Sequence, residues 1–135
     1  MSNPSPLPYR RRRYLVIACA IVWTAAFVVT HTPSEHLPRL HAKDVTLHLI
    51  GYFILASLFL LTLYARGTSR HRRAALVFLI MLTYGALDEI TQPLANRSAA
   101  FFDWVADGIG TIAAILVCEL LLAMSVMRRR LRARH

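Results

Sequence analysis

The chain has 135 residues, of which 56% are hydrophobic, and a formal net charge of +9 at pH 7. This length suits one domain, and the apolar fraction exceeds the roughly 45–50% of typical soluble domains, which argues against a soluble fold. The basic residues form short clusters between apolar runs, a pattern that argues against nucleic-acid binding and is typical of the flanks of membrane helices.

Four apolar runs predict four transmembrane helices at about residues 14–30, 45–65, 74–93 and 101–127. The first run has no charge and just enough length to cross a hydrocarbon core of about 30 Å. A cleaved signal peptide is the competing interpretation of this run, but Val28, Val29 and Thr30 make a poor cleavage site. The third run is apolar only to Leu87, so it spans only by continuing to about Pro93.

The segments between and beyond these runs are read as loops and tails. Residues 1–13 are expected to form a mobile basic tail and residues 128–135 a second basic tail. Pro93 and Asn96 mark a turn before the fourth helix. Within that helix, a series of small residues predicts close approach of a neighbouring helix. These residues are Ala106, Gly110 and Ala114. The predicted fold class is therefore an all-α polytopic membrane protein with a small bundle of four transmembrane helices.

The distribution of positive charge predicts the orientation in the membrane. Residues 10–13, the loop 66–73 and residues 128–134 carry four, four and five arginines, whereas the other side carries three basic residues. By the positive-inside rule, both termini are cytoplasmic in a multi-pass protein of the cell membrane. All acidic residues but Glu119 then lie at or near the outer face. Glu119 is expected to be protonated or to pair with a loop arginine such as Arg66.

Residues 84–110 hold four of the seven acidic residues between two apolar runs. These acidic residues are Asp88, Glu89, Asp103 and Asp107, and the stretch also holds Gln92 and Arg97. A carboxylate near hydrocarbon is costly unless it is paired, hydrated or neutralised, which makes the stretch a candidate site. Helical spacing places His48 and Tyr52 on one stripe of the second helix at a similar depth. The second, third and fourth predicted helices are expected to enclose a polar cleft that faces outward. Asp88 and Glu89 lie about 100° apart, so at least one must point away from the centre.

Carboxylates and a histidine are the oxygen and nitrogen ligands that hold divalent metals, and they also serve as general acids and bases. The ligand-binding candidates are His48, Tyr52, Glu89, Gln92, Arg97, Asp103 and Asp107. The metal candidates are His48, Asp103 and Asp107, and the catalytic candidates are Asp88 and Glu89. The sequence requires no cofactor, and a divalent metal is compatible with it. The structural alternative is that these groups neutralise one another and hold the helix ends together.

The same residues resemble the VanZ-like family of bacterial membrane proteins. At and just before the predicted second helix, the chain has Lys43, Asp44, His48 and Tyr52, and the resemblance extends from Lys43 to about Ala114. The later matching residues are Leu87, Asp88, Glu89, Gln92, Arg97, Ser98, Asp103 and Gly110. This chain departs from the family in the order Lys43-Asp44 and in having Asp107 where asparagine is usual. The resemblance implies a small protein of the bacterial envelope, in a family named for a member linked to teicoplanin resistance.

The leading hypothesis is a VanZ-like envelope protein whose outward-facing polar cleft binds an envelope or lipid-linked ligand, with a link to glycopeptide resistance. One alternative is a metal-dependent hydrolase or transferase that acts on a lipid-linked substrate at the outer leaflet. A small proton-coupled transporter is another. The expected partners are the lipid bilayer and a cell-wall precursor or lipid-linked ligand, without nucleic acid, and a homo-oligomer is left open.

Overall fold

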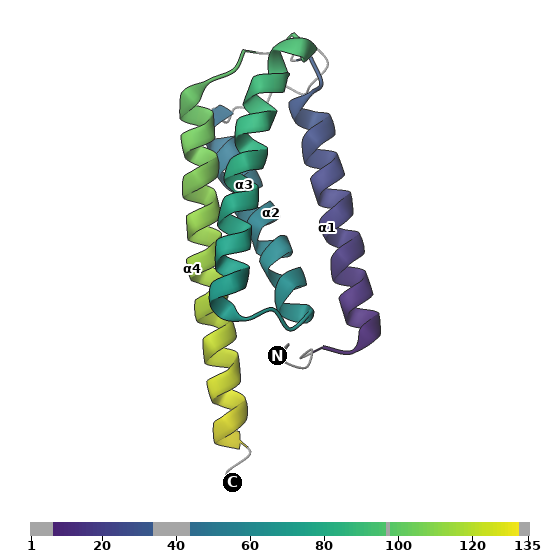
Figure 1. Ribbon diagram of the computed structural model, residues 1–135, viewed down its shortest axis with the longest axis vertical. Helices are drawn as coiled ribbons and strands as arrows, with labels where there is room; N and C mark the ends of the chain where they lie inside the picture. The colour runs from purple at the N-terminus through teal and green to yellow at the C-terminus, as the bar shows by residue number, and fades with distance from the viewer. Residues whose placement is uncertain (1–6, 34–43, 97, 133–135) are drawn as a thin grey trace.

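The protein is a bundle of four α-helices with no strand among the residues that the computed structural model describes, namely 7–33, 44–96 and 98–132 (Figure 1). The helices are α1 (Tyr9–Thr30), α2 (Asp44–Ala65), α3 (Arg70–Thr91) and α4 (Phe101–Arg132), and a short 3-10 helix, η2 (Gln92–Ala95), follows α3. Each of the four α-helices is long and apolar enough to cross a membrane. The prediction of an all-α, multi-pass membrane protein is confirmed.

Three helix boundaries differ from the sequence-based expectation. α1 begins at Tyr9 instead of 14, α3 begins at Arg70 instead of 74, and α4 continues to Arg132 instead of 127. Much of the two predicted basic tails is therefore helical. The reason is that arginine is a good helix former, so a helix need not end where its apolar run ends. Pro8, which directly precedes α1, has the extended backbone that lets a helix start after it.

The turns lie where the sequence predicts them. Gly67, two residues after the end of α2, has a left-handed backbone (φ 79°), and the N–H of the next residue, Thr68, bonds back to the Leu63 carbonyl at 3.1 Å. This is the Schellman pattern, which glycine permits because it lacks a Cβ. At the other end of α3, Pro93 lies within η2, and left-handed Asn96 (φ 55°) ends it. The predicted turn at Pro93 and Asn96 is confirmed.

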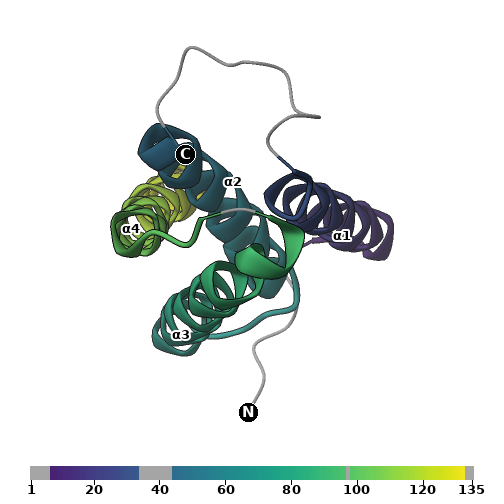
Figure 2. The same cartoon turned by 90° about the horizontal axis from the view of Figure 1, so that it is seen from above.

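α2 lies at the centre of the bundle, with α1 and α4 on opposite sides and α3 against both α2 and α4 (Figure 2). The tightest approach is between α2 and α4 at Gly110, where an added Cβ would lie only 2.3 Å from the carbonyl oxygen of Leu49. Ala106 and Ala114, one turn before and after, are also buried. The predicted close approach along these small residues is confirmed.

α1 packs more loosely than the other helices. Cys19 is its only buried residue, and an apolar groove of about 620 Å³ separates it from α2 and α3. Trp23 crosses this groove, with its ring edge-on to Phe59 and Tyr84 at centroid distances of 5.7 and 5.2 Å. α1 is also joined to α3 by polar contacts at one end of the bundle.

The two ends of the bundle differ in charge. The acidic end, uppermost in Figure 1, holds the start of α2, the end of α3 and the start of α4. The arginine end holds the α2–α3 loop, and there α4 extends past the other helices (Figure 1). At the arginine end, buried Glu119 pairs with Arg73, with N–O distances of 2.5 and 2.6 Å. The expected type of partner is therefore present, but it is Arg73 and not Arg66, because α3 begins early enough to bring Arg73 beside α4.

Candidate functional site

The acidic end brings three predicted site residues from three helices to one point. His48 lies in the second turn of α2, Glu89 near the end of α3 and Asp103 in the first turn of α4. One ligand atom from each side chain lies within 4.8 Å of the other two. All three side chains are buried, at 7–8% exposure. We call this set the metal-ligand triad, because one imidazole and two carboxylates are typical ligands of a divalent transition metal.

The orientation of His48 is set by a fourth site residue, Asp107, one turn further along α4. The Nδ1 atom of His48 lies 2.9 Å from Oδ1 of Asp107, and its Nε2 atom lies 4.0 Å from Oδ2 of Asp103. A carboxylate only accepts hydrogen bonds, so Nδ1 is the donor and Nε2 is directed into the triad. A histidine that ligates a metal is commonly oriented in this way by a carboxylate on its other nitrogen.

Glu89 also bonds outside the triad. Its Oε2 accepts a hydrogen bond of 2.7 Å from the backbone N–H of Ala100, just before α4, and its Oε1 lies 3.4 Å from the side-chain nitrogen of Gln92. Glu89 therefore ties the end of α3 to the start of α4. Such bonds are expected if the acidic groups serve only to hold the helix ends together. They also fix the position of the Glu89 carboxylate within the triad.

A second layer of polar atoms lies beside the triad. The hydroxyl oxygens of Tyr52 and Thr111 and Oδ2 of Asp107 are buried with no hydrogen-bond partner among the described residues. Gly85 of α3 makes room for this layer, since a Cβ there would lie 2.9 Å from Asp107 Oδ2 and 3.3 Å from the Tyr52 hydroxyl. Buried polar atoms without partners are uncommon in native proteins, and they leave this layer able to bond a ligand or water.

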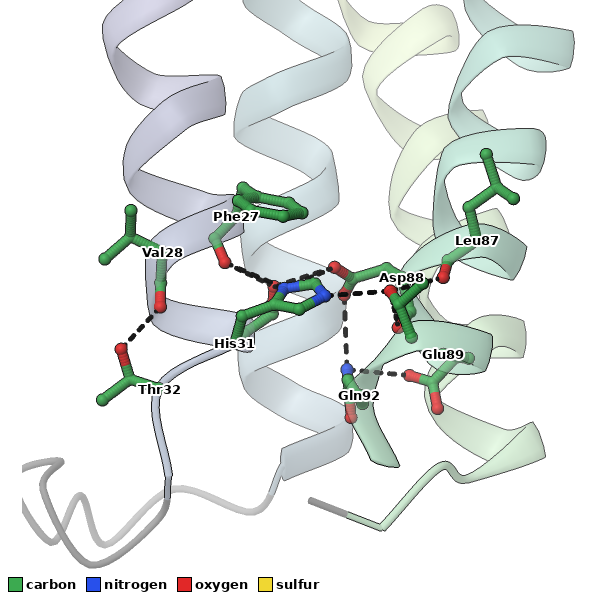
Figure 3. A network of polar contacts seen from close by, with 10 residues as sticks. Phe27, Val28, His31, Thr32, Leu87, Asp88, Glu89 and Gln92 are labelled. Atoms are coloured by element: carbon green, nitrogen blue, oxygen red, sulfur yellow. Dashed lines mark hydrogen bonds and ion pairs between the residues drawn. The ribbon is translucent and has the colours of Figure 1, made fainter. Parts of the chain in front are cut away.

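Asp88, one of the two catalytic candidates, does not join the triad. It accepts a hydrogen bond of 2.8 Å from the Thr30 hydroxyl of α1, and its Oδ1 lies 3.7 Å from Nδ1 of His31 (Figure 3). His31 also lies 2.9 Å from the hydroxyl of Thr91 through Nε2. The expectation that Asp88 and Glu89 face different ways is confirmed: Glu89 faces α2 and α4, whereas Asp88 faces α1.

Gln92 connects the two groups. It is 1% exposed, and its side-chain nitrogen lies 3.3 Å from Asp88 Oδ2 and 3.4 Å from Glu89 Oε1 (Figure 3). The sequence-based site thus contains the triad, its neighbour Asp107, and Gln92 as a bridge. Of the remaining predicted residues, Tyr52 lies in the second polar layer, and Arg97 lies outside the described residues, as does Lys43 of the family resemblance.

Thr30 and His31 were not among the sequence-based candidates. Thr30 is the last residue of the first apolar run, and His31 begins the predicted loop that follows. The signal that could have found them is depth: Thr30 ends α1 and His31 caps it, at the level where α3 ends with Asp88 in its last turn, so both residues are close enough to meet a buried carboxylate.

Comparison with family models, curated proteins and solved structures found no match for this chain. The class of protein that the fold and the acidic end define is a multi-pass, all-α membrane protein with a buried histidine–carboxylate cluster. The VanZ-like resemblance stays a prediction. The expected outward-facing cleft also stays a prediction.

Proposed function

We propose that this chain is a VanZ-like cell-envelope membrane protein in which His48, Glu89 and Asp103 hold a divalent metal ion, and that the metal site binds an envelope or lipid-linked ligand. The observation that carries the proposal is the approach of the three ligand atoms to within 4.8 Å of one another. Ligand atoms around a bound metal at about 2.0–2.2 Å are separated by distances of this order after small side-chain adjustments.

The donor set favours a transition metal such as Zn²⁺ or Mn²⁺. Imidazole suits these ions, whereas an all-oxygen site would suit Mg²⁺ or Ca²⁺. A divalent cation also neutralises buried carboxylates, whose charge is otherwise costly. Among the described residues, the basic groups at ion-pair distance from Asp88, Asp103 and Asp107 are the imidazoles of His31 and His48, which are cationic only when protonated.

Three protein ligands leave at least one coordination position for another molecule. An oxyanion, either phosphate or carboxylate, is the chemistry that a divalent metal takes at such a position. With the arginine-rich segments in the cytoplasm, the acidic end faces the outer leaflet, where the head group of a lipid-linked envelope ligand lies. These arguments favour a phosphate- or carboxylate-bearing lipid as the ligand.

The same donor set favours a second candidate, a metal-dependent hydrolase or transferase that acts on a lipid-linked substrate. A metal with an open position activates water or polarises a phosphoryl oxygen. Glu89 and Asp88 were the sequence-based candidates for a catalytic base; Asp88 now pairs with α1, and Glu89 belongs to the triad. Metal-dependent release of phosphate or head group from a lipid-linked phosphate would select this candidate over binding alone.

The test is the metal content of the purified full-length protein. We expect about one divalent metal ion per chain, lost in the variants His48→Ala, Glu89→Gln and Asp103→Asn, because each removes one of three ligands. Asp88→Asn is the matched control, since it makes the same chemical change on a neighbouring carboxylate outside the triad. It should retain the metal.

A wild-type protein that stays free of bound metal after reconstitution with Zn²⁺ or Mn²⁺ would contradict the proposal. Equal loss in Asp88→Asn and Asp103→Asn would show that the acidic end attracts ions without a defined site. The link to glycopeptides is tested separately: cells that express the wild type should be less sensitive to teicoplanin than cells that express Asp103→Asn at the same level.

A further inference from the structure

A second groove opens at the arginine end, between the end of α2, the start of α3 and the second half of α4. It has a volume of about 420 Å³ and shares no residue with the metal-ligand triad. Its polar wall carries Arg70, Arg73 and Arg130 together with Glu119. Because it lies beside the loop between α2 and α3, at the level where the apolar runs of both helices end, it faces the head groups of a bilayer.

The arginines that line this groove outnumber its single carboxylate. Arg73 and Glu119 form a buried, two-bond ion pair, and Arg73 also donates to the Thr68 carbonyl at 3.0 Å. The side chain of Arg70 is 67% exposed, with Nε 3.5 Å from a Glu119 oxygen that Arg73 already holds. Arg130 is exposed as well. The groove lining therefore carries three arginines and one carboxylate, and two of the arginines, Arg70 and Arg130, are exposed at its mouth.

The α4 lining of the groove between Glu119 and Arg130 is apolar. It is formed by α4 residues that lie one turn apart or adjacent, among them Leu122, Val126 and Met127. Val126 is 39% and Met127 58% exposed. A groove with two arginines at its mouth and a hydrocarbon wall matches a molecule with an anionic head and an acyl chain.

We propose that this groove binds an anionic phospholipid, with the phosphate bound by Arg70 and Arg130 and an apolar part of the lipid against Leu122 and Val126. Arginine donates paired hydrogen bonds to phosphate oxygens, which lysine cannot do with the same geometry. Basic pockets between transmembrane helices are recurrent sites for anionic lipid head groups. The Arg73–Glu119 pair fixes the back of the groove, because it holds α3 against α4. This inference is independent of the metal-site proposal.

The test is a titration of the purified full-length protein in detergent, with bound lipid counted by native mass spectrometry. Phosphatidylglycerol should bind more tightly than phosphatidylcholine. In the double variant Arg70→Gln/Arg130→Gln, affinity for phosphatidylglycerol should fall roughly 25-fold, at about fivefold for each arginine. The matched control is Arg10→Gln/Arg11→Gln, which removes two exposed arginines of α1 outside the groove. It should bind phosphatidylglycerol as the wild type does.

A second variant, Ala123→Phe, tests the groove with every charge retained. Ala123 is an exposed residue of the groove wall, so a larger side chain fills the path of the acyl chain without disturbing a buried core. Weaker binding of phosphatidylglycerol in this variant supports a bound lipid. Unchanged binding, equal affinity for the two lipids, or an equal loss in the α1 control would overturn the proposal, because each shows attraction by the overall charge and not by this groove.

Discussion

At the scale of single residues, the acidic end is organised around His48. One of its ring nitrogens bonds to Asp107 and the other faces Asp103, with Glu89 completing the triad. Asp107 has two oxygens with different surroundings: Oδ1 orients His48, and Oδ2 lies against the backbone of α3 at Gly85 with no hydrogen-bond partner among the described residues. The space that Oδ2 of Asp107 occupies therefore depends on the absence of a side chain at Gly85.

This arrangement predicts the effect of changing Asp107. Asp107→Ala removes the acceptor that orients His48, and metal affinity should fall about 10- to 100-fold, as when other groups that orient a metal ligand are removed. Asp107→Asn keeps an oxygen acceptor at the same place, so its loss should be smaller. Competition with a metal-binding dye measures both affinities. Equal affinities in the wild type and Asp107→Ala would show that Asp107 does not support the site.

At the scale of helices, the α2–α4 contact sets the site, because His48 and Asp103 lie on these two helices near Gly110. A Cβ at Gly110 would lie 2.3 Å from the Leu49 carbonyl oxygen, whereas a Cβ at Gly108 would meet nothing within 4 Å. A methyl group added at Gly110 therefore requires the backbone to move, whereas a methyl group added at Gly108 does not.

Gly110→Ala should therefore destabilise the protein by about 1–3 kcal/mol, the usual cost of overpacking. Gly108→Ala, in the same helix, should be neutral or slightly stabilising, because alanine favours a helix more than glycine does. Thermal unfolding in detergent, followed by tryptophan fluorescence, compares the two. Similar transition temperatures for both variants would contradict the close contact.

The α3–α4 contact at the arginine end depends on the buried pair of Arg73 and Glu119, whose side chains are 10% and 6% exposed. Arg73→Leu leaves Glu119 buried without its main partner and should cost about 3–5 kcal/mol of stability. The double variant Arg73→Leu/Glu119→Leu removes both charges and should recover most of that loss. Unfolding measurements on the single and double variants test this, and an equally unstable double variant would contradict it.

At the scale of the whole molecule, the separation of charge between the two ends predicts the orientation. Ala99 is exposed near the acidic end and Ser69 is exposed at the arginine end, so each reports one side. In a background without Cys19 and Cys118, a membrane-impermeant maleimide applied to intact cells should label Ala99→Cys and not Ser69→Cys. The reverse pattern would place the metal-ligand triad on the cytoplasmic side and contradict the proposed ligand.

The number of helices and the depth of the polar residues followed from the sequence, because both depend on local properties. The length of each apolar run sets whether it can span, and helical spacing places His48 in the same layer as Glu89 and Asp103. The ends of the helices were less predictable, as Arg70 shows: it begins α3 four residues before the apolar run, because helix propensity and hydrophobicity are separate properties.

The sequence by itself determined that this protein is a four-helix membrane bundle with most of its acidic groups at one end and most of its arginines at the other. Only the tertiary structure decided which of those groups meet. It brought Glu89 close to His48, turned Asp88 toward Thr30 of α1, and paired Glu119 with Arg73. The physical reason is that each choice depends on how one helix is rotated and how closely it approaches the next. Those quantities are set by contacts between segments far apart in the chain.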